Sequence, residues 1–148
     1  MLVGRLLLVS VAGTLASTCR SPTAVLPPEG AVPFTPPAVY ASWWSMVEQC
    51  VGRAAPFEAV RWYVMPGAHS FNLGDLRVAG VWTRAGNAIT VGEYARMNGQ
   101  LVRHEMLHAI VQGGAHPRSL YLDRCAGVVT CGENCVREAG PASPPSPT

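Results

Sequence analysis

One short segment of the chain carries residues that could bind a metal ion. His104-Glu105-Met106-Leu107-His108 sets two imidazoles four positions apart, and on a helix such positions share one face, one turn from each other. Both rings could then hold one zinc ion. Glu105 lies about 100° further around the helix than His104, where its carboxylate could take a proton from a water molecule that the ion activates. The pattern predicts metal-assisted hydrolysis with Glu105 as general base.

The residues around this pair predict the helix that it requires. The segment from about Met97 to Gln112 is apolar on several sides, which is typical of a central buried helix, and Gly113-Gly114 should end it. Burying two histidines and a glutamate there without a compensating role would be costly. We therefore favour a metal site over a structural histidine pair beside a surface glutamate.

The five-residue motif resembles the active-site helix of the zincin metallopeptidases. The resemblance implies that His104 and His108 bind one Zn²⁺ ion, that Glu105 is catalytic, and that the substrate is a peptide or protein. Zincins also place a substrate-aligning strand just before this helix, and a strand at Ala88–Val91 could serve. More loosely, residues 39–135 and the apparent export signal are similar to small bacterial lipoproteins.

A catalytic zinc ion takes three protein ligands and leaves one position open, so a third ligand is expected. We predict His116, because Gly113-Gly114 can turn the chain back toward the ion and Pro117 stiffens the backbone directly after it. Asp123 and Glu133 are the alternatives, since other zincin branches use a later carboxylate.

The chain departs from the metzincin branch of that family. In metzincins the third histidine lies six residues past the second, whereas His116 lies eight past His108. No methionine occurs after Met106, so the Met-turn that forms the floor of metzincin sites is absent. The chain is therefore not a standard metzincin.

Other polar residues receive weaker interpretations. We expect His69 to lie in a surface loop after Pro66-Gly67. A residue that stabilises an oxyanion cannot be assigned, although the conceivable donors are Tyr94, Arg103, Tyr121 and Arg124.

The pattern outside the motif predicts an α+β domain over residues 39–138, with a short twisted antiparallel or mixed sheet, an N-terminal helix and the central zincin-like helix. The expected elements are a helix from Trp43 to about Gly52 capped by Ser42, a strand at Glu58–Met65, and strands at Val78–Thr83 and Ala88–Val91 that form a hairpin across Ala85-Gly86-Asn87.

The composition of the two ends of the chain indicates that neither end belongs to the folded domain. Arg5 and an apolar run from Leu6 to Ala16, too short to cross a bilayer, predict a signal peptide over residues 1–19. Residues 20–38 are expected to be a proline-rich tether, and residues 139–148 a disordered proline-rich tail. A net charge of +2 without a basic run argues against a nucleic-acid partner.

Leu15-Ala16-Ser17-Thr18-Cys19 resembles the lipobox of bacterial lipoproteins, in which the cysteine becomes lipidated. The motif usually has Gly, Ala or Ser directly before the cysteine, where this chain has Thr18, and an aliphatic residue three positions before it, where this chain has Ala16. Ordinary signal-peptide cleavage near Ala16 is therefore the alternative. The expected location is the bacterial cell envelope, on the membrane if Cys19 carries lipid, or otherwise secreted or periplasmic.

Four cysteines remain if Cys19 carries lipid, an even number that could form two disulfides in an oxidising compartment. Of the three possible pairings, we predict Cys50–Cys125 and Cys131–Cys135. A zinc site on Cys131 and Cys135 is the weaker alternative, because no second cysteine pair has a suitable spacing.

Together these features predict an exported zinc-dependent peptidase. The alternative is a non-catalytic surface lipoprotein, a binding module with a structural or vestigial zinc site. Glu105 argues against this alternative, because a structural site has no use for a base. The sequence sets neither the substrate preference nor the oligomeric state.

Overall fold

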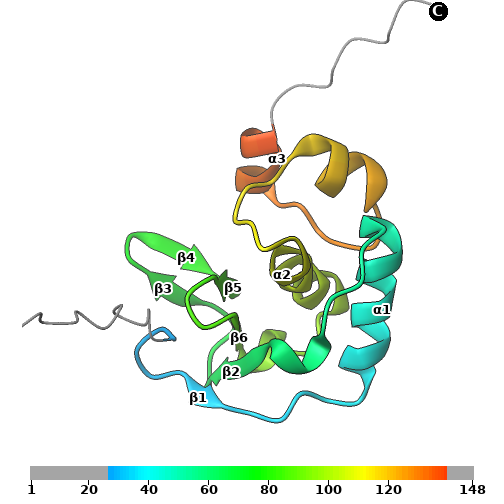
Figure 1. Ribbon diagram of the computed structural model, residues 1–148. Coiled ribbons are helices and arrows are strands. Elements are labelled where there is room, and N and C mark those ends of the chain that lie inside the picture. The colour runs from blue at the N-terminus through cyan, green and yellow to red at the C-terminus, as the bar shows by residue number, and fades with distance from the viewer. Residues whose placement is uncertain (1–26, 140–148) are drawn as a thin grey trace, which may run out of the picture.

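Four strands form the sheet on which the central helix packs. The computed structural model describes residues 27–139, so the expected signal peptide, Cys19, the first part of the tether and residues 140–148 lie outside the described residues. The strand order is β1 (Val32–Pro33), β2 (Arg61–Met65), β6 (Ala88–Gly92) and β5 (Gly80–Thr83). Because β2 and β6 are parallel and the other neighbours antiparallel, the sheet is mixed, and the predicted α+β class is confirmed (Figure 1).

The predicted hairpin between β5 and β6 is present. Gly80 pairs with Val91 and Thr83 with Ala88, and residues 84–87 connect the strands. Asn87 adopts a left-handed conformation with φ 45°, which asparagine tolerates better than most residues. Its side chain accepts a hydrogen bond from Trp82 Nε1 (2.9 Å) and donates one to the Ala59 carbonyl (3.0 Å). The turn is thereby tied to the segment that precedes β2.

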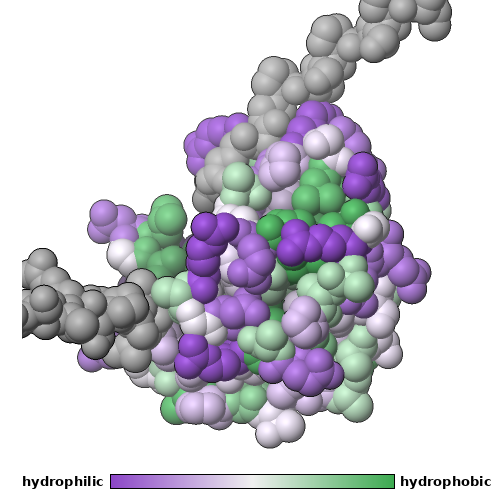
Figure 2. Space-filling view, viewed as in Figure 1, coloured by the Kyte–Doolittle hydropathy of each residue, from purple (hydrophilic) through white to green (hydrophobic). Residues whose placement is uncertain are grey.

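The expected strand Val78–Thr83 is two strands, because Ala79 lies between β4 (Leu76–Val78) and β5. β4 pairs with β3 (Phe71–Leu73) in a second hairpin that the sequence pattern did not indicate. This hairpin projects from the body of the domain (Figure 1). Leu73 and Leu76 are exposed near its turn, and Figure 2 shows apolar surface on the projection.

Helix α1 (Val39–Val51) begins four residues earlier than expected, so Ser42 lies inside it and does not cap it. The backbone N–H of Tyr40 donates to the carbonyl of Pro37 (2.9 Å), and prolines are tolerated before and at a first helical turn because no N–H is needed there. Tyr40, Trp44 and Val47 are buried at helical spacing. Burial of the Tyr40 ring therefore extends the helix toward its N-terminus.

Part of the expected tether belongs to the fold. Val32 and Pro33 pair with β2 as an edge strand, where the missing proline N–H is harmless. Phe34 packs against the core, with edge contacts to Tyr40 and Trp62. The high proline content of residues 20–38 argued against a strand there. An edge strand tolerates proline, so this argument did not hold for Val32–Pro33.

The central helix α2 (Gly99–Val111) lies between the sheet and α1 (Figure 1). Val102, Met106, Leu107 and Ile110 are fully buried on it, consistent with the expected helix that is apolar on several sides. Within residues 27–139, no helix combines the length and the apolar character needed to cross a membrane.

The region expected to be loops contains two further helices. They are a short π-helix at Ser119–Arg124 and α3 (Glu133–Ala139), which begins within the cysteine-rich segment and includes the first residue of the expected tail. The predicted disulfides, Cys50–Cys125 and Cys131–Cys135, are confirmed. The first joins the end of α1 to the end of the π-helix, and the second closes a tight loop at the start of α3.

Replacing Cys50 and Cys125 together by serine should destabilise the domain more than replacing Cys131 and Cys135. The first bridge spans 75 residues and the second spans 4, so the chain-entropy argument gives losses of about 4 and about 2 kcal/mol. Denaturant unfolding of both double variants measures this order. Equal losses would show that local packing, not loop closure, sets the contribution of each bridge.

Candidate metal centre

Two histidines on α2 face the same side of the helix. Nε2 of His104 lies 3.2 Å from Nε2 of His108. The start of the helix is capped by Asn98, whose side chain accepts a hydrogen bond from the Leu101 backbone N–H (3.2 Å). The two rings therefore meet across one helical turn, as the four-residue spacing predicts.

His116 returns to this pair from the loop after α2. The helix ends at Gln112, which takes the left-handed conformation with φ 56°, and Gly113-Gly114 come next. The His116 Nε2 atom lies 3.1 Å from Nε2 of His104 and 3.1 Å from Nε2 of His108. The turn back is the predicted one, although Gln112 and not a glycine adopts the left-handed conformation.

The two carboxylates considered as alternatives to His116 do not belong to the histidine cluster. Asp123 is exposed on the π-helix and pairs with Arg118 at 3.8 Å. Glu133 is exposed at the start of α3. Among the residues that the structure describes, the group that could hold a metal ion consists of His104, His108 and His116.

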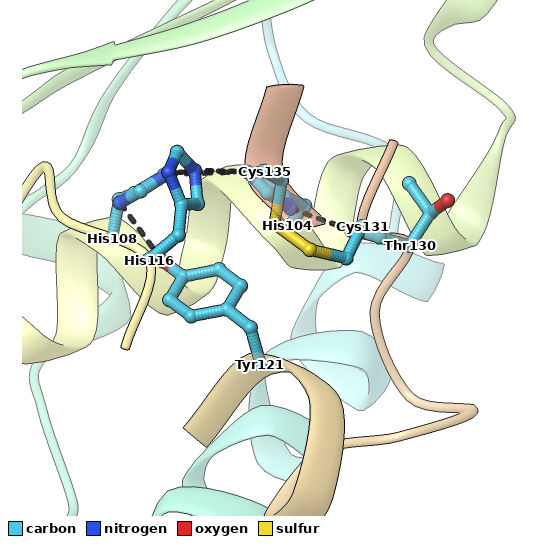
Figure 3. The surroundings of a disulfide bond; sticks show 7 residues. All are labelled: His104, His108, His116, Tyr121, Thr130, Cys131 and Cys135. Carbon is cyan, nitrogen blue, oxygen red and sulfur yellow. Dashed lines mark hydrogen bonds between the residues drawn. A yellow bond between two sulfur atoms is a disulfide. The ribbon is translucent and has the colours of Figure 1, made fainter. Parts of the chain in front are cut away.

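Backbone carbonyls orient two of the three rings. Nδ1 of His104 lies 2.6 Å from the Thr130 oxygen, and Nδ1 of His108 lies 2.7 Å from the Gly113 oxygen. Because a carbonyl oxygen only accepts, each Nδ1 must carry the proton, and each Nε2 then carries the lone pair that can bind a cation. Figure 3 shows the imidazoles grouped together, with Tyr121 and the Cys131–Cys135 disulfide near them.

The spacing of the three nitrogens fits a metal ion. Two nitrogens bound to a tetrahedral zinc at about 2.0–2.1 Å are about 3.3–3.4 Å apart, and the observed separations are 3.1–3.2 Å. Imidazole also suits copper, iron and nickel. The three histidines could thus hold a metal ion, but the donor set alone does not identify it.

Tyr121 forms the floor under the three rings. Its ring centroid lies 5.1 Å from that of His104, 5.3 Å from that of His108 and 4.9 Å from that of His116. The side chain is fully buried, and its hydroxyl lies 2.8 Å from Nδ1 of His108. Burial raises the pKa of Tyr121 well above the usual range, so the hydroxyl stays protonated at neutral pH.

The role of Tyr121 was missed by the sequence interpretation, which considered it only as a conceivable oxyanion donor. None of the four conceivable donors lines the cavities beside the histidines. The direction of the Tyr121 ring depends on a π-helical turn, a conformation rare enough that no sequence pattern indicated it. The sequence has no methionine after Met106 that could lie under the histidines as in metzincins. In this structure the Tyr121 ring takes that position.

Glu105 is buried beside the histidines, against strand β5. Burial raises the pKa of Glu105 to about 8, and a hydrogen bond from the Trp82 backbone N–H partly opposes that rise. Strand β5 can pass this close because residue 80 is glycine. A Cβ atom there would lie 3.0 Å from Cγ and 3.1 Å from Oε1 of Glu105. The carboxylate is therefore held by the strand as well as by its own helix.

The strand that lines the cavity is β5, and not the segment Ala88–Val91, which the sequence offered as a strand that could align a substrate. That segment belongs to β6, which has β2 on one side and β5 on the other, so both of its edges are paired. Strand β5 ends the sheet order and contributes Gly80 to the cavity wall.

A cavity of about 490 Å³ opens beside His104, Glu105 and His116. Its other walls come from the β4–β5 junction, the start of α2 and the segment from Thr130 to Cys135. A peptide side chain could enter a space of this size. His104 and His116, two of the three histidines that could hold a metal ion, thus lie at a cavity wall and not in the closed core.

His69 lies apart from the centre, as expected for a surface loop. Its ring packs against the exposed Tyr94, with centroids 4.7 Å apart. It therefore serves as a reference residue for experiments on the three clustered histidines.

No protein-family model, curated protein or solved structure matches the chain. The assignment of chemistry therefore depends on the geometry of the centre itself.

Replacing His116 by alanine should remove most metal binding, because only two nitrogens of the cluster remain. Elemental analysis after loading with Zn²⁺ and desalting should fall from about one ion per chain to a small fraction of that value. His69→Ala is the matched control and should keep the full content. Full metal content in His116→Ala would show that His116 is not a ligand.

Replacing Tyr121 by leucine should weaken Zn²⁺ binding roughly ten- to a hundredfold, the usual effect of losing a group that orients ligands. Tyr121→Phe keeps the ring and loses only the hydroxyl, so its effect should be smaller. Calorimetric titration of the metal-free protein gives the affinities, and denaturant unfolding without metal checks that each variant folds. Wild-type affinity in a folded leucine variant would contradict the floor role.

Proposed function

We propose that this protein is an exported zinc-dependent peptidase that hydrolyses peptide bonds with the help of a metal ion. The observation that carries the proposal is the convergence of three imidazole Nε2 atoms beside a buried carboxylate, Glu105, at the wall of a cavity. Three histidines leave a tetrahedral zinc ion one open position, which is the arrangement of catalytic and not of structural sites.

The three histidines would hold the ion, with His104 and His108 fixed by carbonyl oxygens. A bound zinc ion supplies Lewis acidity, which polarises a carbonyl and brings the pKa of water to about 7. Glu105 accepts the proton as the water attacks and then passes it to the leaving amine. Each proton transfer uses the same carboxylate, so Glu105 returns to its starting state.

Burial of Glu105 supports this role more than a structural one. A carboxylate removed from water costs free energy unless it is compensated, and a structural metal site gains nothing from it. Burial raises the pKa of Glu105 to about 8, and a cation held by the histidines would lower it again and so favour the carboxylate form that a general base needs. The Trp82 N–H and the close approach of Gly80 hold the group in one position.

The position of β5 at the edge of the sheet, beside the cavity, supports a peptide as the substrate. An extended peptide can add to such an edge through its backbone, which would lay it alongside Glu105. The geometry favours an extended segment of peptide or unfolded protein over a folded surface.

The two disulfides are typical of an oxidising compartment outside the cytosol. They support the export part of the proposal. Anchoring through lipid on Cys19 concerns a residue outside the described range and remains a prediction, which mass spectrometry of the mature N-terminus would test.

Replacing Glu105 by glutamine should abolish peptide cleavage and leave zinc binding intact, because the amide cannot accept the proton but keeps nearly the same shape. The measurement combines metal content with cleavage of a mixed peptide library, and Glu58→Gln, at an exposed position away from the cavity, is the matched control. A wild-type protein that binds zinc but cleaves no peptide would favour a non-catalytic binding module.

A further inference from the structure

Glu133 is a charged residue that the proposed chemistry leaves without a role. It does not belong to the histidine cluster, yet it lines the same cavity as His104 and Glu105. The Cys131–Cys135 disulfide closes the segment with Glu133 at its centre. Cys135 is buried and also lines the cavity. The bridge, which lies near the three histidines (Figure 3), therefore holds the segment that carries this exposed carboxylate at the cavity wall.

The lining of the cavity is mainly apolar and includes Val78, Ala79 and Leu101. The chain has eleven arginines and lysines, but none of them is among the residues that line this cavity. Besides the histidines, its ionisable side chains are the carboxyl groups of Glu105, which is buried, and Glu133, which is exposed.

We propose that Glu133 makes this cavity select a substrate residue with a cationic side chain, lysine or arginine. The inference rests on the proposed peptidase function. Lysine and arginine combine a long apolar stem with a charged end. The stem would contact the apolar wall, and the charged end would pair with Glu133 at the exposed end of the cavity.

Glu133 also stands in the first turn of α3, where a carboxylate stabilises a helix through the helix dipole. That contribution is independent of the substrate. A change in substrate preference upon substitution of Glu133 therefore separates a role in selection from a role in helix stability.

The first test compares peptides that differ only by lysine or norleucine at one position, since norleucine keeps the stem and loses the charge. At low salt the wild type should prefer lysine roughly 1.4- to fivefold at one position, the range expected for an exposed ion pair, and the preference should shrink as salt is added. Glu133→Gln should lose the preference and Glu133→Arg should reverse it toward glutamate peptides. Glu58→Gln should behave as the wild type.

The outcomes separate this inference from the proposed function. Peptide cleavage without a preference for lysine, or with a preference that survives in Glu133→Gln, overturns the role of Glu133 and leaves the peptidase proposal standing. Absence of any cleavage overturns the peptidase proposal.

A second measurement does not depend on activity. Lysine hydroxamate and norleucine hydroxamate can each be titrated calorimetrically into zinc-loaded protein, because the hydroxamate binds the ion and presents the side chain to the cavity. Tighter binding of the lysine compound in the wild type, lost in Glu133→Gln, supports the inference. Equal affinities overturn it, whether or not a peptide is cleaved.

Discussion

The convergence of three imidazole Nε2 atoms on one point is the feature on which the rest of this structure depends. Nε2 of His104 and Nε2 of His108 lie 3.2 Å apart, where two unprotonated nitrogens repel, and a cation between them would turn the repulsion into attraction. The carbonyls of Thr130 and Gly113 enforce the tautomer that creates this situation. A fold that keeps such an arrangement must hold the rings from several sides.

The surrounding elements supply those constraints. Packing between the sheet and α1 fixes α2, the left-handed Gln112 redirects the chain toward His116, and the π-helix brings Tyr121 beneath all three rings. Strand β5 then closes the remaining side through Gly80 and the Trp82 N–H. Helix α2, the loop that follows it, Tyr121 and strand β5 thus together fix the positions of the three histidines and Glu105.

The sequence predicted those parts of the site that depend on local periodicity. The His104–His108 pair results from helical spacing, the return of His116 from flexible residues after the helix, and the β5–β6 hairpin from turn chemistry. Tyr121 and the edge position of β5 could not be predicted, because they depend on a rare helical turn and on which strands pair across the sheet. The predicted start of α1 was wrong for a related reason, since burial of Tyr40 outweighed the capping preference of Ser42.

The Cys50–Cys125 bridge has a consequence for how the centre matures. It fastens the residue directly after the π-helix to the end of α1, so the support of Tyr121 is complete only once the thiols are oxidised. If the protein is exported and binds a metal ion as proposed, it would acquire that ion after oxidation, outside the cytosol. Such an order would keep the unfinished protein from competing for the metal pool of the compartment where it is synthesised.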